Sequence, residues 1–321
     1  MRNTIKFIAL LMLCFCILPL NAFARDLIPV GQVIGLELRD HTVTVAAFDE
    51  KLGAASKAAG LEIGDRILCI NGKQIQCTED IRKALETSNG SVTVSISRNG
   101  TQKTFHLTPE ITSDGPKLGL YLRQGVTGIG TVTYYDPETG KFGTLGHGVN
   151  DSSGKLLSLS DGWAYQARVL TVRKGESGDP GQLMGAIESR TPIGKLTANT
   201  AQGVFGTSET GWQGQAVPVA KADEIKTGPA VIRSTVRGTE VREYSVEILK
   251  IYPKSRQNGR NLLIKVTDPA LLEATGGIVQ GMSGSPIIQD GKLVGAVTHV
   301  LVNDPTTGYG IFIENMLDAA A

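Results

Sequence analysis

The chain has 321 residues, with 32 lysines and arginines against 31 aspartates and glutamates, so its formal net charge is +1. This balance does not suggest a nucleic-acid partner, which usually requires a strongly basic surface. The 39 glycines favour a fold made mostly of strands and turns.

The first 24 residues have the pattern of an export signal. "MRNTIK" is basic, "FIALLMLCFCILPL" is apolar, and "NAFA" supplies the small-x-small site of a signal peptidase. Because the apolar run has 14 residues, a retained membrane anchor is the weaker alternative. Removal of this segment leaves 30 basic and 31 acidic residues and two cysteines, Cys69 and Cys77. Two cysteines make no disulfide framework, and free, half-buried thiols are the simpler expectation.

Residues 25–110 are predicted to form a small domain with one sheet and one helix. "DRILCI" is expected to be a strand over residues 65–70, followed by an Asn-Gly turn. Thr78 then begins a helix, whose buried face consists of Ile81, Ala84 and Leu85. "SVTVSISRNGTQKTFHL" predicts a hairpin that closes through a second Asn-Gly turn.

The stretch "AAGLEIGDRILCINGKQI", together with the helix and hairpin after it, resembles a PDZ domain of the bacterial-protease type. In such domains a loop of the form x-apolar-Gly-apolar presents N–H groups to the terminal carboxylate of a peptide, which adds as a strand. The resemblance implies peptide binding at "VIGL", which is Val33, Ile34, Gly35 and Leu36. Alternatively, "VIGLEL" is simply the first strand of a sheet, or the groove is filled by the protein's own segment.

Residues 111–321 are predicted to form a second, mostly β domain. Short apolar runs such as "GIGTVTYYD", "KFGTLGHGV" and "YQARVLTV" are separated by turn signals, which favours a β-sandwich or barrel. Only "ALLEAT" and "NMLDAAA" have a helical pattern.

The segment "GIVQGMSGSPII", residues 277–288, predicts a nucleophilic serine. Gly281 has no side chain to block approach, so its N–H and that of Ser283 can both point at a carbonyl oxygen that develops negative charge. We therefore expect Ser283 to be the nucleophile and Gly281 and Ser283 to form the oxyanion hole. Ser285 is less suited because Pro286 restricts its backbone. The alternative is a plain glycine-rich loop ahead of a strand.

His147 is the histidine best placed to serve as the base. It stands between two glycines, 136 residues before Ser283, as expected if the two residues come from different barrels facing one cleft. His41 and His106 are expected to be ordinary residues of the first domain, and His299 lies inside the strand after the nucleophile turn. The histidines are dispersed and no Cys/His cluster has ligand spacing, so no metal and no cofactor is predicted.

The carboxylate that would orient the histidine is not settled by the pattern alone. Asp136 and Asp151 bracket His147. Asp268, in "TDPALLEA", has the features of a helix N-cap, because an aspartate followed by proline commonly begins a helix.

The segment from Thr267 to Leu317, together with "GTLGHGV" and the PDZ-like domain, resembles the stage IV sporulation protein B family of serine peptidases. The resemblance covers nearly the whole mature chain. It implies a chymotrypsin-like double β-barrel with His147 as general base, Ser283 as nucleophile and Asp268 as the third catalytic residue.

The same resemblance implies a function in sporulation signalling. Members of the family are exported into the space between the two membranes around the forespore, where they cleave the exposed part of a membrane-bound regulator. This cleavage frees an intramembrane protease that activates a late sigma factor, and the PDZ domain is implicated in control and self-cleavage. The alternative is a non-catalytic PDZ-containing scaffold, which would have no reason to keep both His147 and Ser283.

Overall fold

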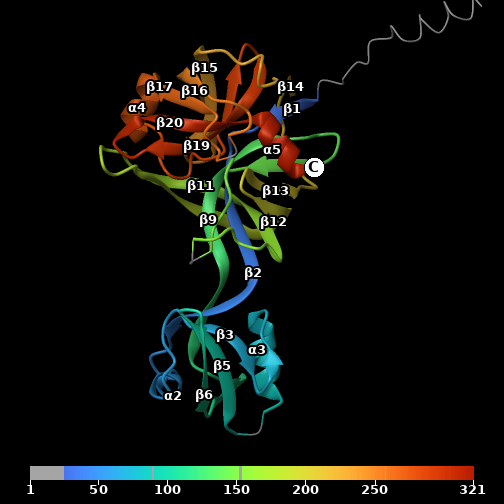
Figure 1. Cartoon of the computed structure of the whole chain (residues 1–321), viewed down its shortest axis with the longest axis vertical. Coiled ribbons are helices and arrows are strands. Elements are labelled where there is room, and N and C mark those ends of the chain that lie inside the picture. The colour runs from blue at the N-terminus through green and yellow to red at the C-terminus, as the bar shows by residue number, and fades with distance from the viewer. Residues whose placement is uncertain (1–24, 89, 152–153, 257) are drawn as a thin grey trace, which may run out of the picture.

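A computed structural model describes residues 25–321, apart from residues 89, 152–153 and 257. The predicted export segment, residues 1–24, lies outside the described residues. The molecule is elongated, with two β-barrels at one end and a small domain at the other, joined by two long paired strands (Figure 1). Within the described residues, no helix is long and apolar enough to cross a membrane.

The first barrel closes through six of the described strands, each antiparallel to its neighbours. In order around the barrel they are β2 (Val33–Phe48), β9 (Leu120–Tyr135), β10 (Lys141–Thr144), β13 (Gly203–Thr207), β12 (Gln182–Thr200) and β11 (Asp161–Arg173). Alternate residues of the strands point inward and build one apolar core that includes Ile34, Val132 and Phe142. Two short strands, β1 (Asp26–Pro29) and β14 (Val217–Pro218), extend the sheet beyond β9.

The second barrel is also closed, and it contains the predicted nucleophile segment. Its strands, in order around the barrel, are β15 (Gly228–Arg237), β16 (Glu240–Ile251), β17 (Leu262–Val266), β20 (Asp304–Phe312), β19 (Lys292–Leu301) and β18 (Pro286–Gln289). The two predicted helices are present as α4 (Pro269–Thr275) and α5 (Ile313–Ala320). The expected double β-barrel is therefore confirmed.

The small domain has a separate core and a five-stranded sheet in the order β9-β2-β3-β5-β6. The far ends of β2 and β9 supply two strands, and the rest are β3 (Arg66–Ile70), β5 (Val92–Arg98) and β6 (Thr101–Leu107), with β4 (Lys73–Gln74) beside β3. Helices α2 (Ala54–Ala58) and α3 (Thr78–Glu86) flank it, and a small hairpin of β7 (Glu110–Thr112) and β8 (Gly115–Lys117) precedes β9.

Most local predictions for the small domain are confirmed. Both Asn-Gly pairs adopt positive φ and close two-residue turns, and Ile81, Ala84 and Leu85 form the buried face of α3. The predicted cap is wrong by one residue: Cys77 is the N-cap, and the Asp80 carboxylate accepts from the N–H of Cys77 at 3.1 Å. Cys69 and Cys77 are free and half-buried, as expected.

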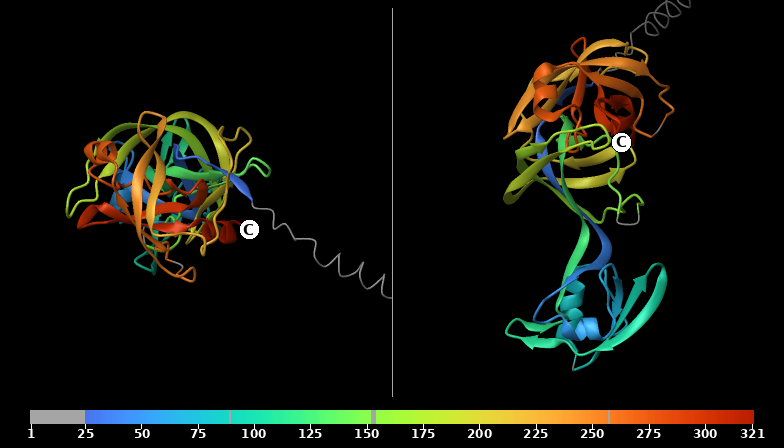
Figure 2. Two further views of the ribbon diagram at one scale, coloured as in Figure 1. Left: turned by 90° about the horizontal axis from the view of Figure 1, so that it is seen from above. Right: turned by 90° about the vertical axis from the view of Figure 1, so that its left-hand side faces the viewer.

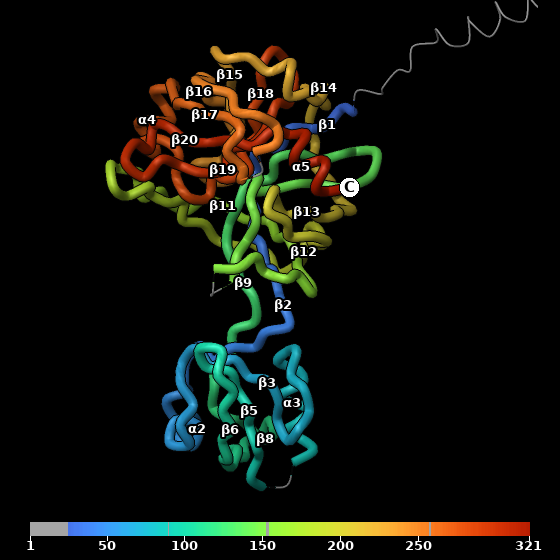
Figure 3. The backbone as a smooth tube through the Cα atoms, viewed as in Figure 1, coloured from blue at the N-terminus to red at the C-terminus, as the bar shows by residue number. Residues whose placement is uncertain are grey.

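The predicted assignment of residues 25–110 to one domain needs correction. Residues 26–38 belong to the first barrel, where β2 pairs with both β9 and β11. The small domain is thus an insertion between β2 and β9, and the chain descends along one strand and returns along the other (Figures 2 and 3). The sequence pattern missed this because one 16-residue strand serves both domains without a break in its apolar alternation.

Candidate active site

The predicted nucleophile loop lies between α4 and β18 and packs against the first barrel. Gly281 and Gly284 have φ of +99° and +97°, a conformation that side chains disfavour. A Cβ at Gly284 would lie 2.0 Å from the carbonyl oxygen of Thr131. Glycine at this position therefore lets the loop of one barrel touch strand β9 of the other.

Two peptide planes of the loop are held by hydrogen bonds. The carbonyl of the Gln280–Gly281 peptide accepts from the N–H of Leu183 at 2.8 Å, and the carbonyl of the Met282–Ser283 peptide accepts from the N–H of Ser285 at 2.9 Å. Both peptides are trans, so each N–H points opposite to its carbonyl. Neither N–H donates to any described residue. The loop thus holds two oriented, unused donors, which an oxyanion hole requires.

Thr131 of β9 connects the nucleophile loop to the loop that carries His147. Its buried hydroxyl donates to the carbonyl oxygen of Gly281 at 2.9 Å, and its N–H donates to the carbonyl oxygen of Ser283 at 3.1 Å. Its carbonyl oxygen accepts from the N–H of Leu145. One residue therefore sets the position of both loops.

His147 follows β10 through a tight turn, in which Leu145 and Gly146 have φ of 68° and 69°. Its Nδ1 atom lies 2.9 Å from the carbonyl oxygen of Gly148. If Nδ1 carries the proton and donates to that oxygen, Nε2 is left as a proton acceptor. Burial lowers the pKa of His147 below 6.5, which the contact with Gly148 partly offsets, so the neutral form prevails at neutral pH.

Residues Thr298 and His299 of β19 lie next to both predicted catalytic side chains. The Ser283 hydroxyl donates to the carbonyl oxygen of Thr298 at 2.9 Å, and the ring of His299 lies 5.5 Å from the ring of His147, centroid to centroid. Ser283 and His147 thus contact consecutive residues of β19, and no hydrogen bond joins their side chains in this structure. The serine hydroxyl is bonded to Thr298 and must rotate before it can donate to the histidine.

His299 is a member of the site that the sequence did not reveal. Its Nδ1 atom is buried and has no hydrogen-bond partner among the described residues. Burial lowers the pKa of His299 to about 4, with smaller contributions from His147 and Arg260. The only signal in the sequence was its place in the strand after the nucleophile loop, a feature shared by every residue of β19.

Asp268 occupies the N-cap of α4. One carboxylate oxygen accepts from the N–H of Leu271 at 3.0 Å and the other from the N–H of Ser245 at 3.3 Å. Asp268 and His147 are both described, and no hydrogen bond or ion pair joins them. The contacts in this structure thus support the capping alternative and not the third catalytic role.

The two other candidate carboxylates also have structural contacts. Asp136 is buried, forms an ion pair with Arg25, and accepts from the Thr139 hydroxyl at 2.6 Å. Asp151 lies in the loop after His147 and accepts from the N–H of Lys155 at 3.1 Å. For the Nδ1 atom of His147, the orienting group in this structure is a backbone carbonyl.

The prediction that Val33 to Leu36 bind a peptide is wrong. These residues are buried in the first barrel, hydrogen-bonded to β9 on one edge and to β11 on the other. A Cβ on Gly35 would lie 2.5 Å from the side chain of Ile187, so this glycine serves packing between strands. No strand edge is open here to accept a peptide.

The small domain contains a second stretch of the same form, "KLGL", residues 117–120. The carbonyl of Leu118 accepts from the buried Ser56 hydroxyl at 2.6 Å, and that of Gly119 accepts from the N–H of Asp49 at 2.9 Å. Because both peptides are trans, the N–H groups of Gly119 and Leu120 point away from these partners. Two adjacent outward donors can bind a carboxylate. The sequence contains both "VIGL" and "KLGL", and the pattern alone does not distinguish the buried copy from the other.

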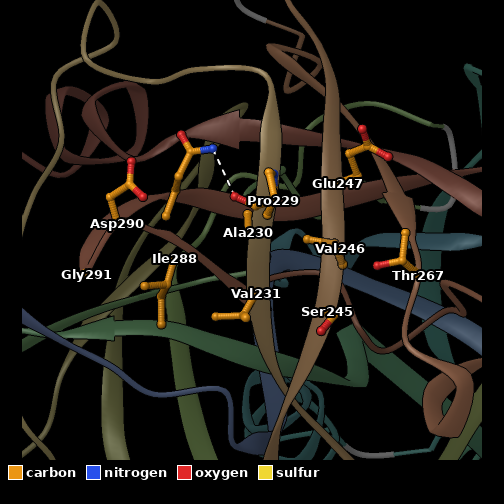
Figure 4. A pocket seen from close by; sticks show the side chains of 11 residues that line it. Pro229, Ala230, Val231, Ser245, Val246, Glu247, Thr267, Ile288, Asp290 and Gly291 are labelled. Carbon is orange, nitrogen blue, oxygen red and sulfur yellow. Dashed lines mark hydrogen bonds between the residues drawn. The ribbon is translucent and has the colours of Figure 1, made fainter.

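The open hollow in Figure 4, of about 680 Å³, lies over β15, β16 and β18 of the second barrel. None of His147, Ser283 and His299 lines it. Among the described residues, no group of three or more His, Cys, Asp or Glu side chains is placed to hold a metal ion.

The model of the SpoIVB peptidase S55 family matches residues 114–317, and a PDZ domain model matches residues 51–98. The chain belongs to the SpoIVB peptidase S55 family. The chain therefore combines a peptidase domain of this family with a PDZ domain.

Other similarities of this S55 peptidase are partial. A protein of Rhizobium meliloti (strain 1021) named "Putative zinc metalloprotease" is 30% identical over 44% of the chain, and one of the same name from Agrobacterium fabrum is 30% identical over 28%. The matches span 34% and 23% of those two proteins.

Two solved structures are also similar. The PDZ domain of an SdrC-like protein from Listeria monocytogenes has 19% identity and a TM-score of 0.22, covering 26% of this chain and 87% of that one. The inactive form of the Rv3671c protease has 15% identity and a TM-score of 0.33, covering 60% and 82%.

Proposed function

We propose that the chain is an exported serine endopeptidase in which Ser283 attacks the substrate carbonyl and His147 takes the serine proton. The observation that carries this proposal is the pair of fixed peptide planes that leave the N–H groups of Gly281 and Ser283 free beside the serine. Those donors would stabilise the oxyanion that forms on attack, and loss of one such donor typically costs about 3 kcal/mol of transition-state stabilisation.

The first step is rotation of the Ser283 hydroxyl from the carbonyl of Thr298 toward Nε2 of His147. This exchanges one hydrogen bond for another, so its cost is on the order of 1 kcal/mol. Catalytic hydrogen bonds commonly form only when substrate is bound. The Gly148 carbonyl would hold the ring in the accepting tautomer during this step.

At the level of the cell, we propose the role implied by the family. The enzyme would be exported by its N-terminal segment into the space between the forespore and mother-cell membranes. There it would cleave the exposed part of a membrane-bound regulator of an intramembrane protease that activates a late sigma factor. The PDZ domain would bind a peptide and regulate cleavage, including self-cleavage. Family membership and the sequence pattern of residues 1–24 support this proposal.

A fluorophosphonate probe on the purified chain tests the enzymatic core of the proposal. We expect covalent labelling of Ser283 and loss of both labelling and peptide hydrolysis in Ser283→Ala, with an unchanged melting temperature. Ser285→Ala is the matched control for hydrolysis, because the Ser285 hydroxyl is buried against Ser234 and out of reach. Hydrolysis at the wild-type rate by Ser283→Ala would remove Ser283 from the mechanism.

A further inference from the structure

One edge of strand β9 is open over most of its length. On its other edge, β9 pairs with β2 from Leu120 to Thr131. On the open edge, the described strand β10 joins it only from Val132 onward, whereas β1 pairs with Tyr134 and Tyr135 on the opposite edge, which β9 shares with β2. An unpaired strand edge is a template for another chain, so this edge can accept an extended polypeptide.

The open edge begins at the two outward N–H groups of the PDZ domain. The carbonyl of Gly119 is bound to Asp49, next to β2, so the N–H of Leu120 points to the open side. Helix α3 lies along the same segment: β8 contacts it, and the amide of Gln124 donates to the carbonyl of Gln76, just before the helix, at 3.2 Å. The lower end of the edge thus holds two backbone donors near helix α3, which we call the nest: the N–H groups of Gly119, a buried residue, and Leu120, a half-buried one.

The upper end of the same edge reaches the catalytic loops. Thr131 donates its N–H to the carbonyl oxygen of Ser283 and accepts from the N–H of Leu145, two residues before His147. Both loops hydrogen-bond to Thr131, where the open edge ends. A chain that follows the edge upward therefore arrives at the nucleophile and the base.

Between these ends lies a hollow of about 560 Å³. Its lining comes partly from β9, partly from the PDZ domain and partly from the loop after His147, and includes Arg66, Arg123, Gln124, Thr127 and Asn150. The polar lining suits the backbone groups of an extended chain. The hollow borders β9 from Arg123 to Thr127, and neither Leu120 nor the catalytic residues line it.

The direction and length of a bound chain follow from strand geometry. A peptide that adds antiparallel to β9 with its terminal carboxylate at the nest must run with its upstream residues toward Thr131. Leu120 and Thr131 are 11 positions apart in β9. At about 3.3 Å per residue this spans roughly 36 Å, which an extended peptide also covers with about 11 residues.

We propose that the preferred substrates are polypeptides held by a free C-terminal carboxylate on the PDZ domain and cut about 11 residues upstream of that terminus. The inference rests on the proposed peptidase and PDZ functions, and it adds the substrate class. Once the C-terminal carboxylate is bound to the PDZ domain, binding of the scissile bond at the active site becomes an intramolecular step. The effective concentration of the scissile bond at the active site therefore rises.

The test uses the full chain and peptides with one scissile sequence followed by spacers of about 4, 11 and 20 residues, each with a free or an amidated C-terminus. We expect the free acid with the middle spacer to exceed its amide in kcat/KM by about tenfold or more, mainly through KM. The shortest spacer should show no advantage of acid over amide, because it cannot reach both sites. Equal rates for acid and amide, or an advantage independent of spacer length, would overturn the proposal.

One variant pair locates the nest. Leu120→Pro removes the outward N–H without removing a bond to β2, and proline is tolerated on edge strands, whereas Leu120→Ala keeps the N–H. We expect only the proline variant to lose the advantage of the free acid. Labelling of Ser283 and cleavage of a casein-like unfolded protein report the peptidase separately. If neither Ser283 labelling nor cleavage of the unfolded protein occurs, the proposed function fails. If both occur but peptide cleavage does not depend on a free C-terminus, only this inference fails.

Discussion

At the scale of single residues, Thr131 and Thr133 form a natural comparison within β9. Both are fully buried and lie on the same strand, but the Thr131 hydroxyl donates to Gly281, whereas the Thr133 hydroxyl has no partner in the part of the chain that the structure describes. We expect Thr131→Val to lower kcat about tenfold or more with little change in KM, because the carbonyl of Gly281 loses the contact that fixes the oxyanion loop.

Thr133→Val is the matched control for this prediction. It removes a buried hydroxyl without a hydrogen bond, so activity should be unchanged and stability equal or higher. Thr131→Ser keeps the hydroxyl and should restore most of the activity. Steady-state kinetics and thermal unfolding of the three variants check the prediction, and equal activity of the two valine variants would contradict it.

The pH dependence of activity should report His147. Burial lowers the pKa of its imidazole below 6.5, so the proton-accepting form is already present at mildly acidic pH. We expect kcat/KM to rise with pH through a midpoint below 6.5 and to level off by neutral pH. A profile from about pH 4 to 8 measures this, with exposed His106→Gln as control. A midpoint near or above 7 would argue against this environment for the base.

Stability should respond to pH in the same window. The pKa of His299 falls to about 4 in the folded chain, so the unfolded chain binds the proton more tightly. The associated stability is complete above the unfolded pKa of 6.5 and is lost as pH falls toward about 4. We expect the melting temperature of His299→Gln to depend less steeply on pH over this range than that of the wild type. Parallel melting curves for the two proteins would contradict the assignment.

At the scale of elements, helix α4 separates the two roles considered for Asp268. Asparagine caps a helix about as well as aspartate but carries no charge. Because the Asp268 carboxylate contacts Leu271 and Ser245 and not His147, we expect Asp268→Asn to keep both the melting temperature and most of the activity. A loss of turnover by orders of magnitude at unchanged stability would show that the charge acts on His147 in the working enzyme.

Sequence reasoning succeeded for elements that local chemistry determines. Asn-Gly turns require positive φ at both residues, and a proline after aspartate marks a helix start, so the hairpins and α4 could be placed from short stretches. It failed where the outcome depends on contacts between distant segments. "VIGL" and "KLGL" have the same pattern, and only the pairing of β2 with β11 shows that the first copy is buried. His299 became part of the site only through its approach to His147.

At the scale of the whole molecule, the PDZ domain is an insertion into the first barrel and not a module ahead of it. Strands β2 and β9 pair up to Leu38 opposite Val126, and pairing resumes with Val43 opposite Gln124. The register shift between these pairs is therefore the junction between barrel and PDZ domain. Only two strands cross this junction, and the first barrel and the PDZ domain have separate hydrophobic cores.

This topology predicts opposite outcomes for two shortened chains. A chain of residues 26–39, an Asn-Gly turn and residues 125–321 keeps all six strands of the first barrel and closes β2 to β9 as a two-residue hairpin. We expect it to fold, to label at Ser283 with a fluorophosphonate, and to cleave short peptides without regard to their C-terminus. Residues 111–321, the domain expected from sequence alone, lack β2 and should not fold, because β9 and β11 would each expose an unpaired edge inside a barrel. Circular dichroism melting and labelling of both chains decide the matter, and a stable, active 111–321 fragment would show that β2 is dispensable to the peptidase.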